Sequence, residues 1–73
     1  MSDLKKRSVI VSGHKTSVSL ETPFWEELSG IAGRSNQSMG TLISTIDRTR
    51  EGNLSSALRL FVLRDLQGRA DKT

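Results

Sequence analysis

The chain has 73 residues, a net charge of +3, one histidine and no cysteine. This length allows one domain at most, and the lack of cysteine excludes disulfides and thiolate metal sites, so we expect no metal and no cofactor. No apolar segment approaches the roughly 20 residues that a membrane span needs, and the apolar stretch near the N-terminus is too short for a signal peptide. We therefore expect a cytoplasmic protein with no membrane partner. A single histidine and scattered carboxylates offer no catalytic dyad or triad, so we expect no enzyme.

The excess positive charge is concentrated near the N-terminus. Residues 1–20 contain four basic side chains and one acidic side chain, whereas residues 21–73 contain seven of each. Charge gathered in this way is typical of a surface that binds an anionic partner, above all nucleic acid. A basic tail that only improves solubility is the alternative.

Residues 1–13 are expected to form a basic N-terminal arm. Its first part is polar and charged, whereas the segment from Ser8 to Ser12 (SVIVS) favours extended structure. Apolar side chains stand at odd positions up to Val11 and at even positions after Gly13, and a glycine at such a change of parity predicts a bulge or a bend. Two interpretations stay open: a short extra strand that continues into the next one, or an arm that becomes ordered only against a partner.

The segment 15–20 alternates between larger residues at even positions and small or polar residues at odd positions. This period of two predicts a strand. No second strand is evident downstream, and an unpaired strand leaves bare backbone N–H and C=O groups. We therefore expect it to pair with the same strand of a second copy. The side chains that it turns outward are Lys15, Ser17 and Ser19.

A first helix is expected to follow this strand directly. Thr22 offers a hydroxyl suited to the N-cap, and Pro23 suits the first helical position. Apolar side chains then recur at spacings of three and four, which predicts an amphipathic helix. The pairing of Gly33 with Asn36 favours a helix end between these two residues.

Two more helices are expected after the turn. Ser38 is a good N-cap for the second, which we expect to end by Arg50, and residues 51–53 (Glu-Gly-Asn) combine a stop with a fresh cap. The third helix is predicted from Leu54 to about Gln67. Because this helix is apolar on more than one side, we expect a second copy of the chain to cover the side that one small chain leaves open.

The order of these features resembles the ribbon-helix-helix family of DNA-binding proteins over residues 14–50. The strand SVSL, the cap Thr22-Pro23, the apolar pair Phe24-Trp25, an asparagine in the turn and the SMGTLI start of the second helix are similar in order and spacing to that family. The segments GHKTSVSLE and NLSSALRLFVL resemble short bacterial members that carry a third helix. Well-studied repressors often hold larger polar side chains at the outward strand positions, so the resemblance implies modest base specificity here.

The resemblance implies a mostly α fold with one short strand per chain. Two chains would form a homodimer with an intermolecular, two-stranded antiparallel ribbon, and each would add a C-terminal helix. The expected boundaries are 1–13 for the arm, 14–50 for the ribbon-helix-helix core, 51–68 for the additional helix and 69–73 for a tail. The side chains expected in the dimer core are Val18, Leu20, Trp25, Leu28, Ile31, Leu42, Ile43, Ile46, Leu58, Phe61 and Val62.

The outward side chains of the strand are the expected base contacts. A two-stranded ribbon fits the major groove of B-DNA, where lysine donates to guanine and serine donates to or accepts from several bases. The resemblance therefore assigns base contacts to Lys15, Ser17 and Ser19.

Phosphate contacts are expected at the start of the second helix, where Ser38 is the cap and the N–H groups of Met39 and Gly40 are free. A purely structural cap is the alternative for Ser38. The basic arm is expected to add further contacts to the backbone of the DNA or to enter an adjacent minor groove. A structural role at the start of the strand is the alternative for the histidine among these residues, which are Lys5, Lys6, Arg7 and His14.

The function implied is that of a homodimeric, sequence-specific DNA-binding protein, a transcription regulator of the repressor type, with double-stranded DNA as its partner. The alternative is a dimeric protein-interaction module, antitoxin-like or an adaptor, that holds a protein partner through residues 54–67. The placement of the positive charge beside the strand favours DNA, and the few residues after the last helix argue against an antitoxin. The operator, the regulated genes, any effector and any assembly above the dimer stay open.

Overall fold

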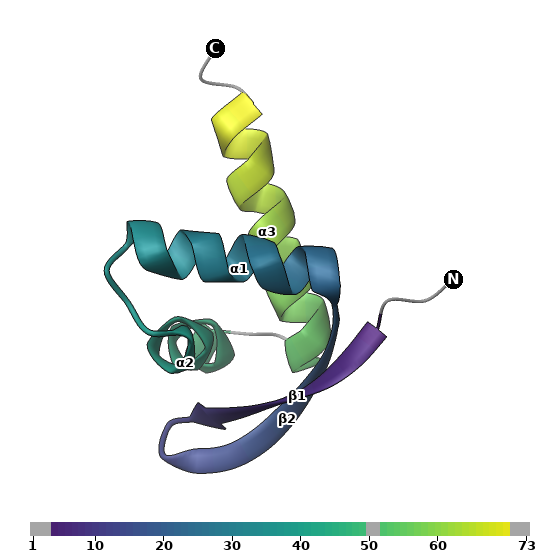
Figure 1. The fold of residues 1–73 in the computed structure, drawn as a ribbon, viewed down its shortest axis with the longest axis vertical. Helices are drawn as coiled ribbons and strands as arrows, with labels where there is room; N and C mark the ends of the chain where they lie inside the picture. The colour runs from purple at the N-terminus through teal and green to yellow at the C-terminus, as the bar shows by residue number, and fades with distance from the viewer. Residues whose placement is uncertain (1–3, 50–51, 71–73) are drawn as a thin grey trace.

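A computed structural model describes residues 4–49 and 52–70, with a two-stranded antiparallel sheet below three helices (Figure 1). The expected helix end at Arg50, residue 51 of the following stop and residues 71–73 of the tail lie outside the described residues. None of the described helices is long and apolar enough to cross a membrane. The elements in chain order are β1 (Leu4–Val11), β2 (His14–Glu21), α1 (Thr22–Arg34), α2 (Met39–Thr49) and α3 (Leu54–Ala70).

The prediction of one short strand per chain was wrong. β1 and β2 each contain 8 residues and pair with one another within the chain, from Leu4 opposite Glu21 to Val11 opposite His14. The arm therefore contributes a full strand. Its period of two was hidden because its three cations, at residues 5–7, follow one another and stand on both sides of the strand. The chain satisfies one edge of β2 by itself, although a ribbon formed between two copies was expected.

The change of parity at Gly13 is the reversal of a hairpin and not a bulge. Ser12 and Gly13 form its two-residue turn, and both have positive φ, at 52° and 81°. Positive φ at both central residues is the mark of a type I′ turn, whose twist matches that of the flanking strands. The turn is also fastened to α2, because the Ser12 N–H donates to the hydroxyl oxygen of Ser44 at 3.0 Å.

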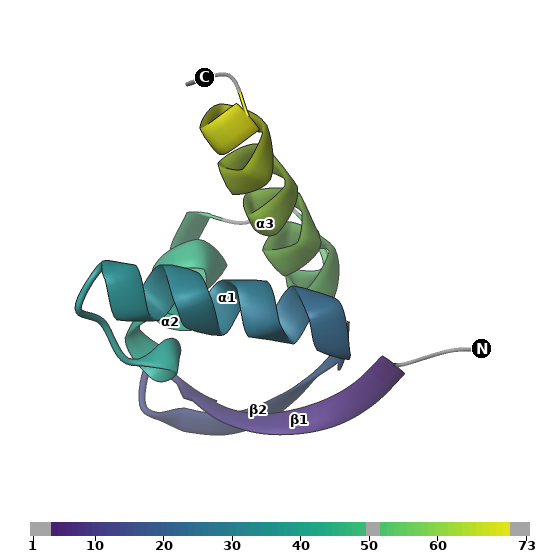
Figure 2. The same cartoon turned by 45° about the horizontal axis from the view of Figure 1, so that its top comes forward.

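The hairpin curls beneath the helices, as a second view shows (Figure 2), and its concave side contributes to the core. All the residues expected in a dimer core are buried in the single chain, except Trp25 and Phe61, which are partly buried and pack against the core. A second copy is therefore not needed to bury them. The core consists of Val9, Val11, Val18, Leu20, Leu28, Ile31, Ala32, Leu42, Ile43, Ile46, Leu58 and Val62.

Helix α1 begins one residue earlier than expected. Glu21 is its N-cap but makes no capping hydrogen bond with its side chain, and Thr22 is already helical. The Thr22 hydroxyl instead accepts a hydrogen bond from the Arg7 guanidinium at 3.2 Å, which ties the helix to β1. The predicted end is confirmed, since α1 stops at Arg34 and Asn36 has the left-handed φ of 55°.

The caps of the other two helices are confirmed. The Thr41 N–H donates to the Ser38 hydroxyl oxygen at 3.1 Å, and the Ser56 N–H donates to the side-chain oxygen of Asn53 at 3.2 Å. Helix α3 continues beyond the expected end at Gln67 and takes in the start of the expected tail. An ion pair between Arg69 and Glu27 of α1, at 2.8 Å, holds this last turn.

Helix α3 is apolar on two sides, as expected, and one of these sides is open. Leu58 and Val62 are buried against the rest of the chain. Three further leucines, at a spacing of three residues, expose 40–49 % of their surface. We name them the leucine stripe, which comprises Leu60, Leu63 and Leu66.

Candidate nucleic-acid interface

The side of the hairpin that faces away from the helices carries a row of exposed, mostly polar side chains. Residues opposite one another in an antiparallel pair lie on the same side of the sheet, so the register puts Lys6 with Ser19, Ser8 with Ser17 and Ile10 with Lys15. We name this surface the outer face. It comprises the exposed residues Leu4, Lys6, Ser8, Ile10, Lys15, Ser17 and Ser19.

The outer face is positively charged. It holds two lysines, and the one carboxylate of the same parity, Glu21, is half-buried at its end. Arg59 of α3 holds that carboxylate with two hydrogen bonds of 2.9 and 3.3 Å. The hydrogen bond from Arg59 lowers the pKa of Glu21 below its ordinary value. The carboxylate thus stays ionised and paired with a cation, which leaves the charge of the two lysines uncancelled on this face.

The two edges of the hairpin are in different environments. The β1 edge lies against α2, where a Cβ atom added to Gly40 would stand 3.0 Å from the carbonyl oxygen of Ile10. On β2, the alternation set by the turn points the backbone groups of Lys15, Ser17 and Ser19 away from β1. Among the described residues, no backbone hydrogen bond from a turn or loop reaches these three. The β2 edge is therefore open.

The basic residues of the arm are divided between the two sides of the hairpin. Lys6 stands on the outer face, whereas Lys5 and Arg7 share the side of Leu20 and Val18. The Arg7 guanidinium carbon lies 4.9 Å from the centre of the Trp25 ring, a cation–π contact. Together with its hydrogen bond to α1, this contact gives Arg7 a role in joining the hairpin to the helix.

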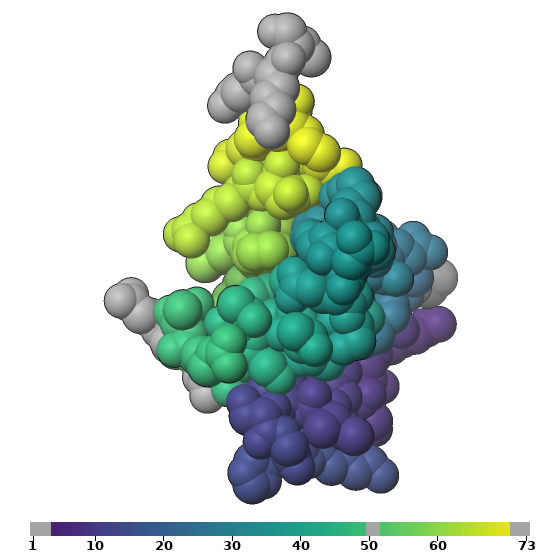
Figure 3. All heavy atoms as spheres, turned by 90° about the vertical axis from the view of Figure 1, so that its left-hand side faces the viewer, coloured from purple at the N-terminus to yellow at the C-terminus, as the bar shows by residue number. Residues whose placement is uncertain are grey.

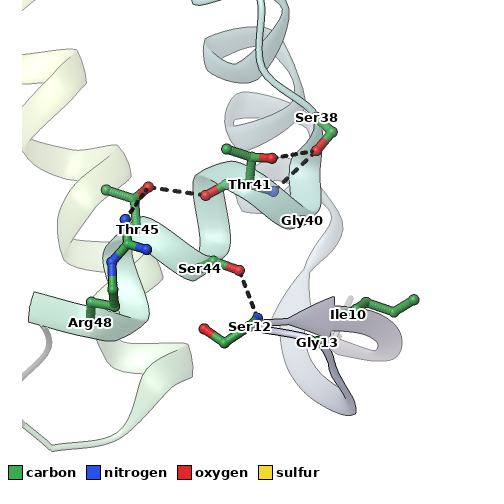
Figure 4. Close-up of a pocket in the computed structure, with 9 residues that line it drawn as sticks. All are labelled: Ile10, Ser12, Gly13, Ser38, Gly40, Thr41, Ser44, Thr45 and Arg48. Atoms are coloured by element: carbon green, nitrogen blue, oxygen red, sulfur yellow. Dashed lines mark hydrogen bonds between the residues drawn. The ribbon is translucent and has the colours of Figure 1, made fainter.

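The expected phosphate contacts at α2 lie beside the tip of the hairpin. A shallow hollow of about 480 Å³ lies between α2 and the tip of the hairpin (Figure 4). Its α2 side includes Ser38, Gly40, Ser44 and Arg48, and its hairpin side includes Ser12. A space-filling view shows α2 directly above the hairpin (Figure 3). The hollow is lined by five serine and threonine residues and by one arginine, together with Ile10, Gly13 and Gly40.

Gly40 has a structural reason to be glycine that the sequence did not reveal. Its close approach is to the Ile10 carbonyl of β1, whereas the expectation was a close approach to phosphate. Met39 beside it is partly buried and packs against the core. His14 is exposed next to the turn, opposite Val11.

Sequence reasoning missed residues of both surfaces, among them Ser8 and Ile10 of the outer face and Arg48 beside the hollow. Ser8 and Ile10 went unnoticed because their segment was interpreted as an arm, and Arg48 because nothing in the spacing of α2 separates it from an ordinary solvent-facing cation. The alternation of buried Val9 and Val11 with exposed residues was the available signal for the first two. In the described ranges, no group of three histidine, cysteine or acidic side chains lies together as a metal site would require.

Comparisons with known proteins agree with this fold. The family model described as a ribbon-helix-helix domain matches residues 4–66. An uncharacterized protein from Bordetella pertussis Tohama I has a similar structure, with a TM-score of 0.79 and 32 % sequence identity. The match covers 93 % of this chain and 59 % of that one, so this chain spans less than two thirds of that protein's length. No curated protein matches the sequence.

Proposed function

Because the chain belongs to the ribbon-helix-helix family, we propose that it is a sequence-specific DNA-binding transcription regulator that reads the major groove with the outer face of its β1–β2 hairpin. Proteins of this family generally bind DNA and dimerise. The observation that carries the proposal is the outer face itself, on which two lysines and three serines stand exposed without a free carboxylate among the described residues.

The hairpin has the dimensions that such a role needs. Two strands lie about 4.8 Å apart, and the major groove is about 12 Å wide. Lys15 donates to the O6 or N7 atom of guanine, while Ser17 and Ser19 bond to the edges of neighbouring bases. β1 adds Ser8 and Lys6 to these contacts from the same chain.

Phosphate contacts complete the proposed complex. The start of α2 presents the N–H groups of Met39 and Gly40 near the hairpin tip, and the positive end of a helix dipole favours an anion there. Arg48, in the last turn of α2, adds a cation beside the hollow. Lys6 sits where it can meet the opposite flank of the groove, and Lys5 and His14 contribute from the two ends of the hairpin.

A homodimer is part of the proposal, and the leucine stripe is the surface we assign to it. Pairing two open β2 edges would make a sheet of four strands, roughly 14 Å across, which is wider than the groove of about 12 Å. Contact through α3 leaves each hairpin free as a two-stranded ribbon. Light scattering tests the assignment: the double variant Leu60→Lys, Leu63→Lys should be a folded monomer.

A salt titration tests the function. Binding to random duplex should weaken as salt increases, with log K falling by about 0.9 per log unit of salt for each phosphate contacted. Changing Lys15, Ser17 and Ser19 to alanine should remove the preference for a selected duplex while circular dichroism stays unchanged. Full preference in this triple variant would refute the outer face as the reading surface.

The second candidate function is a protein-interaction module that holds a partner on α3. The exposed leucine stripe favours it, because three leucines in a row on one helix are more than scattered surface residues. Two results together would support this candidate. The chain would show no salt-dependent DNA binding, and variants of the leucine stripe would keep the wild-type oligomeric state.

A further inference from the structure

Ile10 stands out among the exposed side chains. It exposes 63 % of its surface, against 40–49 % for the other exposed large apolar residues. The register puts it on the outer face, near the tip of the hairpin and directly opposite Lys15. Its neighbours along the strand, Val9 and Val11, point to the other side and are buried. Its exposure is therefore a consequence of the period of two, and its side chain is held in solvent by the core contacts of its neighbours.

The surroundings of Ile10 do not make an apolar patch. The residues nearest to it on the outer face are Ser8, Lys15 and Ser17, and the other apolar residue there, Leu4, lies at the opposite end of the hairpin. Protein interfaces are built from contiguous apolar area, which is absent among the described residues around Ile10. A single aliphatic side chain between a cation and two hydroxyls suits a partner that offers small apolar groups set among charged and polar ones.

Ile10 is also firmly placed. Its carbonyl oxygen is packed against Gly40 at the start of α2, and the turn beyond it is fastened to Ser44. Val11 and His14 close a two-residue turn as a hydrogen-bonded pair, so Ile10 and Lys15 are the next, non-hydrogen-bonded pair. The Cα atoms of such a pair are about 4.5 Å apart, and their side chains stand closest together. The two side chains therefore act at one place along the groove.

We propose that Ile10 is a specificity-determining residue that packs on the C5-methyl group of thymine, next to a guanine bound by Lys15. The inference rests on the proposed function, since it names what the same outer face reads. In the major groove, thymine presents a methyl group and guanine presents two acceptors. An aliphatic side chain beside an ammonium group matches a thymine and a guanine on adjacent base pairs.

The experiment compares thymine with deoxyuridine, which lacks only that methyl group. A duplex selected from a random pool with the wild-type protein is resynthesised with each thymine replaced in turn, and affinities are measured at one salt concentration. Loss of the contacted methyl group should weaken wild-type binding roughly fourfold, the effect of one buried methyl group. The Ile10→Ala variant should bind both duplexes equally, and Ile10→Val should keep the preference.

Leu4→Ala is the matched control, because it removes an exposed aliphatic side chain from the other end of the same face. It should leave the thymine preference intact. Circular dichroism and light scattering on the Ile10 variants establish that the fold and the oligomeric state are unchanged.

The outcomes separate the inference from the function on which it rests. If no duplex binds the wild-type chain with a salt dependence, the proposed function fails and the inference fails with it. The inference alone is overturned if the selected duplex binds and Lys15→Ala weakens that binding, but deoxyuridine does not lower the affinity of wild type. It is also overturned if deoxyuridine lowers the affinity of Ile10→Ala as much as that of wild type. A change of oligomeric state in Ile10→Ala would also overturn it, because Ile10 would then cover a contact between copies.

Discussion

The outer face of the hairpin and the leucine stripe of α3 together hold all the large apolar side chains that the described residues expose, but they hold them differently. On the hairpin, apolar residues are separated by lysines and serines, and the backbone beneath them is anchored to α2. On α3, leucines follow one another at every third position. Ion pairs fix α3 to the rest of the chain through Arg59 and Arg69. Dispersed apolar groups among cations suit a polyanion, whereas contiguous leucines suit a protein.

The largest expected effect is a difference in stability between variants of two leucines on different sides of α3. Leu58 is fully buried and Leu60 exposes 49 % of its surface. Leu58→Ala should lower the free energy of unfolding by about 3 kcal/mol, the usual cost of a core cavity. Leu60→Ala should change it by less than about 0.5 kcal/mol at concentrations where the chain is monomeric. Urea denaturation measures both, and equal losses would mean that the stripe belongs to the core.

The anchor of the hairpin is tested by two glycines. Gly40→Ala puts a Cβ atom 3.0 Å from the Ile10 carbonyl oxygen, so the backbone of α2 or β1 must give way by a few tenths of an ångström. We expect a loss of about 1–3 kcal/mol in unfolding free energy, as in other overpacked sites. Gly68→Ala in α3 meets no atom within 4 Å and should stabilise the chain by about 0.5–1 kcal/mol, because alanine is the better helix former. A neutral Gly40→Ala would show that the hairpin is not held at this point.

Variants of two exposed cations test whether the outer face, and not α3, binds DNA. Lys15 stands on the outer face and Arg64 on the exposed side of α3. Lys15→Ala should weaken binding to a selected duplex by about 1–2 kcal/mol. Arg64→Ala should leave both the affinity and the salt dependence unchanged. Fluorescence anisotropy at several salt concentrations measures the two variants, and equal losses would remove the distinction between the surfaces.

The smallest effect is expected at the ion pair that joins the end of the hairpin to α3. Because Arg59 lowers the pKa of Glu21, the pair stabilises the fold above the ordinary pKa of 4.5 for this carboxyl, and the contribution is lost as pH falls through the lowered value. Wild type should therefore lose more stability on acidification than Glu21→Gln, which has no charge to lose. Thermal unfolding from neutral pH to about pH 3 detects the difference. Parallel curves for the two proteins would contradict it.

The helices were predictable because their signals are local. Ser38 and Asn53 cap α2 and α3 through hydrogen bonds to residues three positions later. Asn36 follows the end of α1 and takes the positive φ that asparagine adopts more readily than most residues. The last turn of α3 was not predictable, because its ion pair with Glu27 joins residues that are 42 positions apart. Short-range chemistry is visible in a sequence, while such a contact depends on the fold.

The hairpin was missed although its turn was noticed. The chain reversal at Gly13 changes the parity of the apolar residues just as a bend would. Only the pairing of β1 with β2 distinguishes a hairpin from a bent strand. Arg7 contributed to this wrong prediction, because an arginine is not expected on the core side of a strand. Only the structure shows that the Trp25 ring packs against it there. The outward positions of β2 to which we assign base contacts were identified from alternation alone, whereas their partners on β1 depended on the register.

The two-residue turn between β1 and β2 has a consequence for the protein at low abundance. A ribbon assembled from two molecules comes apart on dilution, whereas two strands linked by Ser12 and Gly13 meet at an effective concentration that dilution does not change. The outer face is thus complete in every folded copy. In a cell that holds only a few copies, no encounter between molecules has to precede its formation.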